Sequence, residues 1–144
     1  MRSLLDTHIM TASTRRTSTQ IAEALRKLDP ANSLYATQII DLLLAASQAA
    51  GASDLHLQPT PAGLAIRWRL DGVLQKVADI SRGGASDVVA RLKVLAELPT
   101  YRTDVPQEGR IRQERGERET EGKRDGGKAV EMRVGTFPTL FGER

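Results

Sequence analysis

One stretch, LAIRWRLDGVLQKV from Leu64 to Val77, limits the possible folds of this chain more than any other. Read with the two-residue period of a β-strand, its apolar side chains fall on one face and its charged side chains on the other. Asp71 and Gly72 follow, and both residue types tolerate the positive φ angles that a two-residue hairpin turn needs. The sequence therefore predicts an antiparallel hairpin with one face in a core.

The charged face of this hairpin carries two neighbouring arginines, Arg67 and Arg69. Charges on a strand face usually only keep that face in water, and this interpretation stays open. Arg110 and Arg133 also fall opposite the apolar face of expected strands, so an antiparallel sheet could gather all four on one surface. Guanidinium groups are planar, bidentate donors that stay charged, and they suit an oxyanion such as phosphate.

Hydrophobic periodicity places further elements around the hairpin. Helices are expected over 34–50 and 86–98, with Ser86 as the N-cap of the second. A strand is expected over 53–59, ended by Pro59, and two more strands near residue 110 and over 129–138. Strands and helices do not alternate regularly, which favours an α+β fold: a small antiparallel sheet with helices packed on it.

The length of 144 residues suits one domain. Residues 1–33 form a polar lead-in with a short helix over 19–28, which resembles a linker or docking helix more than a core element. The main domain is expected over 34–144. Within it, 112–128 are charged, rich in glycine and without apolar side chains, so we expect a flexible loop there.

The composition limits which classes of partner we expect for this chain. The net charge is +3, from 21 basic and 18 acidic residues mixed along the chain, and aromatic residues make up only 3%. A nucleic-acid partner would favour a concentrated basic stripe with stacking aromatics, so none is expected. There is no cysteine, and we see no signal peptide and no run long enough to span a membrane. We expect a cytoplasmic protein.

Two candidate sites are rejected from the sequence. GKRDGGKA over 122–129 resembles a phosphate-binding loop, but Ala129 has no hydroxyl for Mg²⁺ and a strand, not a helix, is expected after it. Asp54 and His56 share a strand face, yet the chain offers too few ligands for a metal site. A hydrogen bond between these two side chains is the expected arrangement.

Several motifs together resemble a known family. ASDLHLQP, IRWRLDG, VVARLKVLAEL, VPQEGRI and VEMRVGTFPTLFGER occur in the same order, over about 34–144, in the N-terminal domain that precedes the motor domain of type II secretion and type IV pilus assembly ATPases. The resemblance implies a PAS-like fold. It also implies that the full-length protein is a cytoplasmic hexamer that binds ATP and Mg²⁺ and hydrolyses ATP to drive pilus or pseudopilus assembly.

The resemblance also implies roles for particular arginines. Arg67, Arg69 and Arg110 match positions that reach the phosphates of ATP bound to the motor domain, while Arg91 and Arg133 match further arginines of the family pattern. The chain departs from that pattern at Glu108, Gln58 and the long loop 112–128. In the family these positions hold an aspartate, a glutamate and a shorter connection.

This chain lacks the Walker motifs and the catalytic glutamate of the family's motor domain, so we expect no ATP hydrolysis and no cofactor or metal bound by the chain alone. The expected function is a non-catalytic regulatory and assembly domain. It would pack on a motor domain and neighbouring subunits of a hexamer, and contact the inner-membrane secretion platform only indirectly. The alternative is a stand-alone adaptor that binds a secretion-system partner without nucleotide.

Overall fold

The computed structural model describes residues 18–81, 84–113 and 130–144. Within these ranges the helices are α2 (Ser18–Arg26), α3 (Tyr35–Ala50) and α4 (Ala85–Leu95). The strands are β1 (Asp54–Thr60), β2 (Gly63–Leu70), β3 (Val73–Ser81), β4 (Gln107–Gln113), β5 (Val130–Thr136), β6 (Pro138–Thr139) and β7 (Gly142–Glu143).

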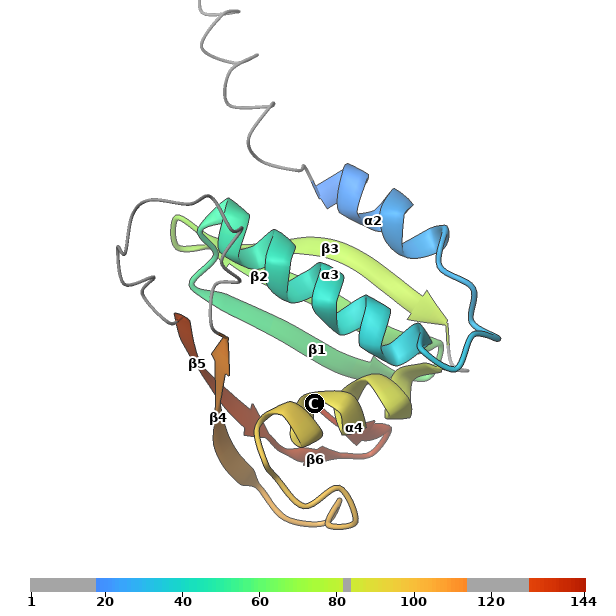
Figure 1. The fold of residues 1–144 in the computed structure, drawn as a ribbon, viewed down its shortest axis with the longest axis vertical. Coiled ribbons are helices and arrows are strands. Elements are labelled where there is room, and N and C mark those ends of the chain that lie inside the picture. The colour runs from blue at the N-terminus through green and yellow to red at the C-terminus, as the bar shows by residue number, and fades with distance from the viewer. Residues whose placement is uncertain (1–17, 82–83, 114–129) are drawn as a thin grey trace, which may run out of the picture.

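The main sheet is antiparallel and has the order β1-β2-β3 (Figure 1). The predicted hairpin is confirmed as β2 and β3, joined at Asp71 and Gly72, whose φ angles are 49° and 80°. Positive φ at both central positions matches the twist of the flanking strands and fixes the pairing. Leu64, Ile66 and Trp68 of β2 are buried, while Arg67 between two of them is exposed.

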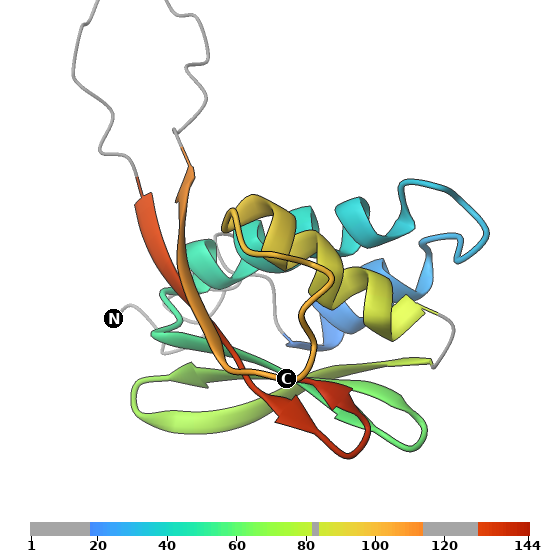
Figure 2. The ribbon, with the colours of Figure 1, turned by 90° about the horizontal axis from the view of Figure 1, so that it is seen from below.

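The helices lie together on one side of this sheet (Figure 2). α3 supplies much of the core, because Ile39, Ile40 and Leu43 are almost fully buried against the sheet's apolar face. The helix ends at Gly51, which adopts the left-handed conformation that glycine tolerates best. The α+β class and the helix expected over 34–50 are thus confirmed, whereas the PAS-like assignment stays a prediction.

The short helix α2 belongs to the folded core. Ile21 is 0% exposed and Leu25 is 6% exposed, and the helix packs on β3 and α3. Our interpretation of this segment as a linker or docking helix was therefore wrong. The apolar stripe of α2 covers the part of the sheet that α3 does not reach, which explains why it is buried.

Several expected boundaries also differ, and α4 ends at Leu95 rather than at residue 98. β1 continues through Pro59 to Thr60, which is possible because β1 is an edge strand and an edge strand can contain a proline. α4 begins at Ala85, one residue before the expected N-cap Ser86, and the residue before it is Gly84. A Cβ at Gly84 would lie 2.7 Å from the Tyr35 ring, so close packing favours glycine there.

The β4–β5 hairpin forms a separate two-stranded sheet, and β6–β7 forms another. In Figure 1 both lie beside β1 and α4. A buried ion pair joins this part to the helices: Lys93 Nζ lies 2.5 Å from Glu143 Oε1 of β7. Lys93 also donates a 2.6 Å hydrogen bond to the Arg102 carbonyl. Of the expected loop 112–128, Arg112 and Gln113 continue β4, and the remainder lies outside the described residues, as does the 122–129 motif.

Candidate functional site: a cationic cleft between two strands

Strand pairing places a row of basic side chains on the outer face of the main sheet. His56 of β1 pairs with Arg67 of β2, which in turn pairs with Lys76 of β3. Lys76 forms an ion pair with Asp79 at 2.6 Å. Arg67 is exposed and forms no ion pair with any residue that the structure describes. Its guanidinium is therefore available to an anion.

Arg69 is held by its neighbours. Its Nε lies 3.3 Å from Asp54 Oδ2, and its Nη1 donates a 3.1 Å hydrogen bond to the Gly72 carbonyl. Asp54 also accepts a hydrogen bond from the Ser53 hydroxyl at 2.9 Å. The expected Asp54–His56 hydrogen bond was wrong, because the Asp54 carboxylate turns toward Arg69 across the strand pair. These contacts fix the direction of Arg69 and leave part of its charge exposed.

The second pair of arginines lies on the other hairpin. Arg110 of β4 and Arg133 of β5 are directly opposite each other in the register, and both are exposed. Arg110 Nη1 lies 3.1 Å from Glu131 Oε1, which balances its charge. Arg133 has no ion-pair partner in the described part of the chain. Two like charges at one register position repel each other, so an external anion would be stabilised there.

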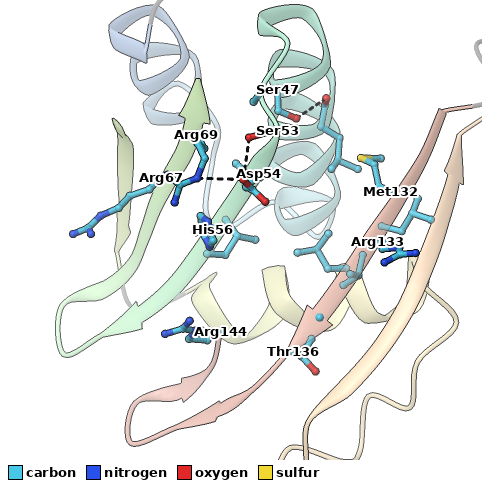
Figure 3. A pocket seen from close by; sticks show the side chains of 18 of the residues that line it. Ser47, Ser53, Asp54, His56, Arg67, Arg69, Met132, Arg133, Thr136 and Arg144 are labelled. Carbon is cyan, nitrogen blue, oxygen red and sulfur yellow. Dashed lines mark hydrogen bonds and ion pairs between the residues drawn. The ribbon is translucent and has the colours of Figure 1, made fainter. Parts of the chain in front are cut away.

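A cavity of about 890 Å³ lies between the main sheet and the β4–β5 hairpin. Figure 3 shows Arg67 and Arg69 on one side of it, Arg133 on the other, and Arg144 at one end. Arg110 and Arg91 are not among its lining residues. The four strand arginines thus lie on two separate sheets rather than on one, and three of them line the same cavity. Their roles stay predictions.

Sequence reasoning missed the buried ion pair. Lys93 is 0% exposed although it is a lysine, and Glu143 is 9% exposed. A signal was present, because Lys93 follows Val89 by one helical turn and so lies on the apolar stripe of α4. A lysine on a buried stripe indicates a partner acid, but nothing local identifies Glu143, which comes fifty positions later.

Two further findings concern what the described residues contain. No three His, Cys, Asp or Glu side chains in residues 18–81, 84–113 and 130–144 gather closely enough to hold a metal ion. None of the helices in these ranges has the length and apolar character needed to cross a membrane. The site is defined by its arginines and by the two strands that flank it.

An antiparallel sheet covered by helices on one face, with a cleft lined by arginines at its edge, defines an α+β domain suited to binding an anionic ligand or partner. Comparison with known proteins identifies the family. The chain belongs to the family described as type II/IV secretion system protein, whose model matches residues 31–144.

Individual relatives agree with this assignment. The chain is 40% identical over 107 residues to "Type II secretion system ATPase E" of Vibrio cholerae, and the matched segment covers 74% of this chain and 19% of that protein. It is 32% identical over 114 residues to "Type IV pilus assembly ATPase TfpB" of Acinetobacter baylyi, covering 79% of this chain and 18% of that protein.

A third similarity, to "Type II secretion system protein E" of Xanthomonas campestris, runs over 142 residues at 32% identity and covers 99% of this chain and 23% of the relative. The chain thus spans about a fifth of the length of the curated relatives it matches. The predicted resemblance to the N-terminal region of secretion and pilus ATPases is confirmed.

Proposed function

We propose that this chain is a non-catalytic regulatory and assembly domain of a type II secretion or type IV pilus assembly ATPase. It packs on a motor domain within a cytoplasmic hexamer and presents Arg67 and Arg69 to the phosphates of ATP that the motor domain binds with Mg²⁺. The inner-membrane secretion platform is contacted only through these partners.

One observation carries the proposal most directly. Arg67 is exposed and unpaired among the described residues, on a central strand whose other face is buried in the core. A cation on such a rigid strand keeps its position when a phosphate approaches, so little reorganisation opposes binding. Arg69 adds a second cation at the next outward position of the same strand, and its ion pair with Asp54 fixes the direction of its side chain.

Residue types also indicate that this chain binds phosphate while the motor domain performs hydrolysis. Phosphoryl transfer needs a phosphate-binding loop with its lysine, Mg²⁺ ligands and a group that positions water. The arginines of the cleft stabilise phosphate charge but do not activate water. We therefore propose that the isolated chain does not hydrolyse ATP and that hydrolysis requires the motor domain.

Titration calorimetry of the 144-residue chain with a motor domain from a relative tests this function. We expect a non-hydrolysable ATP analogue with Mg²⁺ to strengthen the association. Arg67→Ala/Arg69→Ala should weaken the nucleotide-dependent association by about ten- to a hundredfold, because a hydrogen bond to a charged group contributes about 1.5–3 kcal/mol.

The matched control is Arg26→Ala/Lys27→Ala, which removes the same charge from exposed positions on and next to α2 and should leave the association unchanged. Association that ignores nucleotide and survives the Arg67/Arg69 substitutions would favour the alternative function. In that case the chain is an adaptor that binds a secretion-system partner without nucleotide.

A further inference from the structure

Two unpaired strand edges face each other across the cavity. Within the described residues β1 pairs only with β2, and β5 pairs only with β4. The cavity is lined by Asp54–Gln58 of β1 and by Glu131–Thr136 of β5, so the free edges are the ones that border it. In Figure 3 residue numbers increase in the same direction along both strands, from Asp54 to His56 and from Met132 to Thr136. A strand inserted between them would therefore have the same orientation, parallel or antiparallel, relative to both.

The floor of the cavity is apolar and comes from the helix layer. Leu44 of α3 and Val89 and Leu92 of α4 line it. On the flanking strands Leu57 is buried and Met132 half-buried, whereas His56 and Arg133 are exposed. An extended segment in this position would continue both sheets by turning apolar side chains to the helices and polar side chains outward.

The outward positions carry uncompensated positive charge. Asp54 is paired with Arg69 and Glu131 with Arg110, so both acidic side chains that line the cavity are already neutralised. Arg67 and Arg133 remain without an ion pair in the part of the chain that the structure describes. Acidic side chains on the inserted segment would complement them, and guanidinium groups bind carboxylates in a bidentate way.

The edges themselves favour occupation. An exposed strand edge offers a row of free N–H and C=O groups, and natural proteins cover or break such edges. β1 has seven residues and no lysine, and its one proline, Pro59, lies next to its end. Thr136 adds a second signal: its side chain lines the cavity and is 3% exposed, and its Oγ1 has no hydrogen-bond partner among the described residues.

We propose that this cleft is a slot for an extended acidic segment of a partner polypeptide, which adds as a strand to the edge of β1. Main-chain hydrogen bonds to β1 supply affinity, and the alternation of apolar and acidic side chains supplies specificity. The inference goes beyond the nucleotide role, because it rests on the free edges of β1 and β5 and on Arg133 as well as Arg67, and it requires neither ATP nor a motor domain.

The test is a titration of the ¹⁵N-labelled 144-residue chain, without nucleotide, with an end-blocked octapeptide of alternating valine and glutamate. Expected are chemical-shift changes concentrated in β1 and β5 and slower exchange of β1 amide protons. An octapeptide of alternating valine and lysine should bind about tenfold more weakly or worse, because it meets like charges. Two further versions of the peptide are methylated on alternate backbone nitrogens, one on the odd-numbered and one on the even-numbered residues. At least one of them should fail to bind, because pairing with a strand edge needs the N–H groups on that side of the peptide.

The charge-reversal variant Arg133→Glu should weaken the valine–glutamate peptide and strengthen the valine–lysine peptide. Arg112→Glu, an exposed position of β4 outside the cavity, is the matched control and should change neither. Absence of binding at millimolar peptide, or undiminished binding of both N-methylated peptides, would overturn the strand slot. Dimerisation of the unliganded chain in light scattering, blocked by Arg133→Glu, would show that a second copy fills the cleft instead. None of these results depends on Arg67 and Arg69 meeting ATP.

Discussion

At the scale of single residues, the buried ion pair is the most consequential contact. Lys93→Met keeps the length of the side chain and removes its charge, which leaves the Glu143 carboxylate buried without a counter-ion. We expect the free energy of unfolding to fall by about 3–5 kcal/mol, the usual cost of breaking a buried pair from one side. Urea denaturation measures it. The double variant Lys93→Met/Glu143→Gln should lose less than the two single losses added together, and simple additivity would show that the two side chains are not coupled.

The exposed ion pair between Arg69 and Asp54 should contribute much less to stability than the buried pair. Arg69 and Asp54 have side chains that are 40% and 50% exposed, and such pairs contribute about 0–1 kcal/mol. Arg69→Ala should therefore leave the urea midpoint almost unchanged while it weakens the proposed nucleotide-dependent association. A large loss of stability would instead assign Arg69 a structural role and remove it from the candidate site.

Local chemistry explains which residues could be predicted. The hairpin turn at Asp71 and Gly72 and the end of the helix expected over 34–50 depend on neighbouring residues only, and both were predicted correctly. The partner of Asp54 was predicted wrongly, because Arg69 approaches it across the strand pair and only the register reveals that contact. The Lys93–Glu143 pair joins distant parts of the chain, and no pattern within either segment encodes it.

At the scale of elements, β4 packs closely on the residues that follow α4, and this packing favours glycine at one position of β4. A Cβ at Gly109 would lie 2.8 Å from the Ala96 carbonyl oxygen and 3.1 Å from Leu98. Gly109→Ala should lower the free energy of unfolding by about 1–3 kcal/mol, as overpacking does. Gly135→Ala on β5 is the matched control, since its Cβ would meet only Phe137 at 3.6 Å, an ordinary contact. Equal midpoints for the two variants would contradict this view of the packing.

The helix α2 offers a second test at this scale. Its periodicity indicated a helix, but its short apolar stripe did not show whether it packs against a sheet or stays apart. Ile21→Ala should cost about 2–5 kcal/mol, because it removes a fully buried side chain from the core. Glu23→Ala on the exposed side of the same helix should change the unfolding midpoint little, and a similarly small effect of Ile21→Ala would return α2 to the role of a linker.

At the scale of the whole molecule, the α+β class followed from the order of elements, but the arrangement of the arginines did not. Alternation correctly put Arg67 and Arg133 on outward faces. It could not tell whether their strands share a sheet, since pairing between distant strands depends on edges and packing rather than on local pattern. The structure places them on two sheets with a cavity between, and that separation is what makes a strand slot possible.

The same separation predicts unequal local stability. β2 is flanked by strands on both sides, and its inward side chains Ile66 and Trp68 are 0% and 2% exposed. β5 pairs on one side only. Strands with fewer partners open more easily than central strands, so native-state hydrogen exchange should show amide protons of β5 exchanging through local opening and those of β2 only through global unfolding. Binding of the acidic strand should bring the opening free energy of β5 closer to that of β2. If β5 already exchanged only through global unfolding in the free chain, the two sheets would form one cooperative unit, and an empty slot between them would be the wrong description.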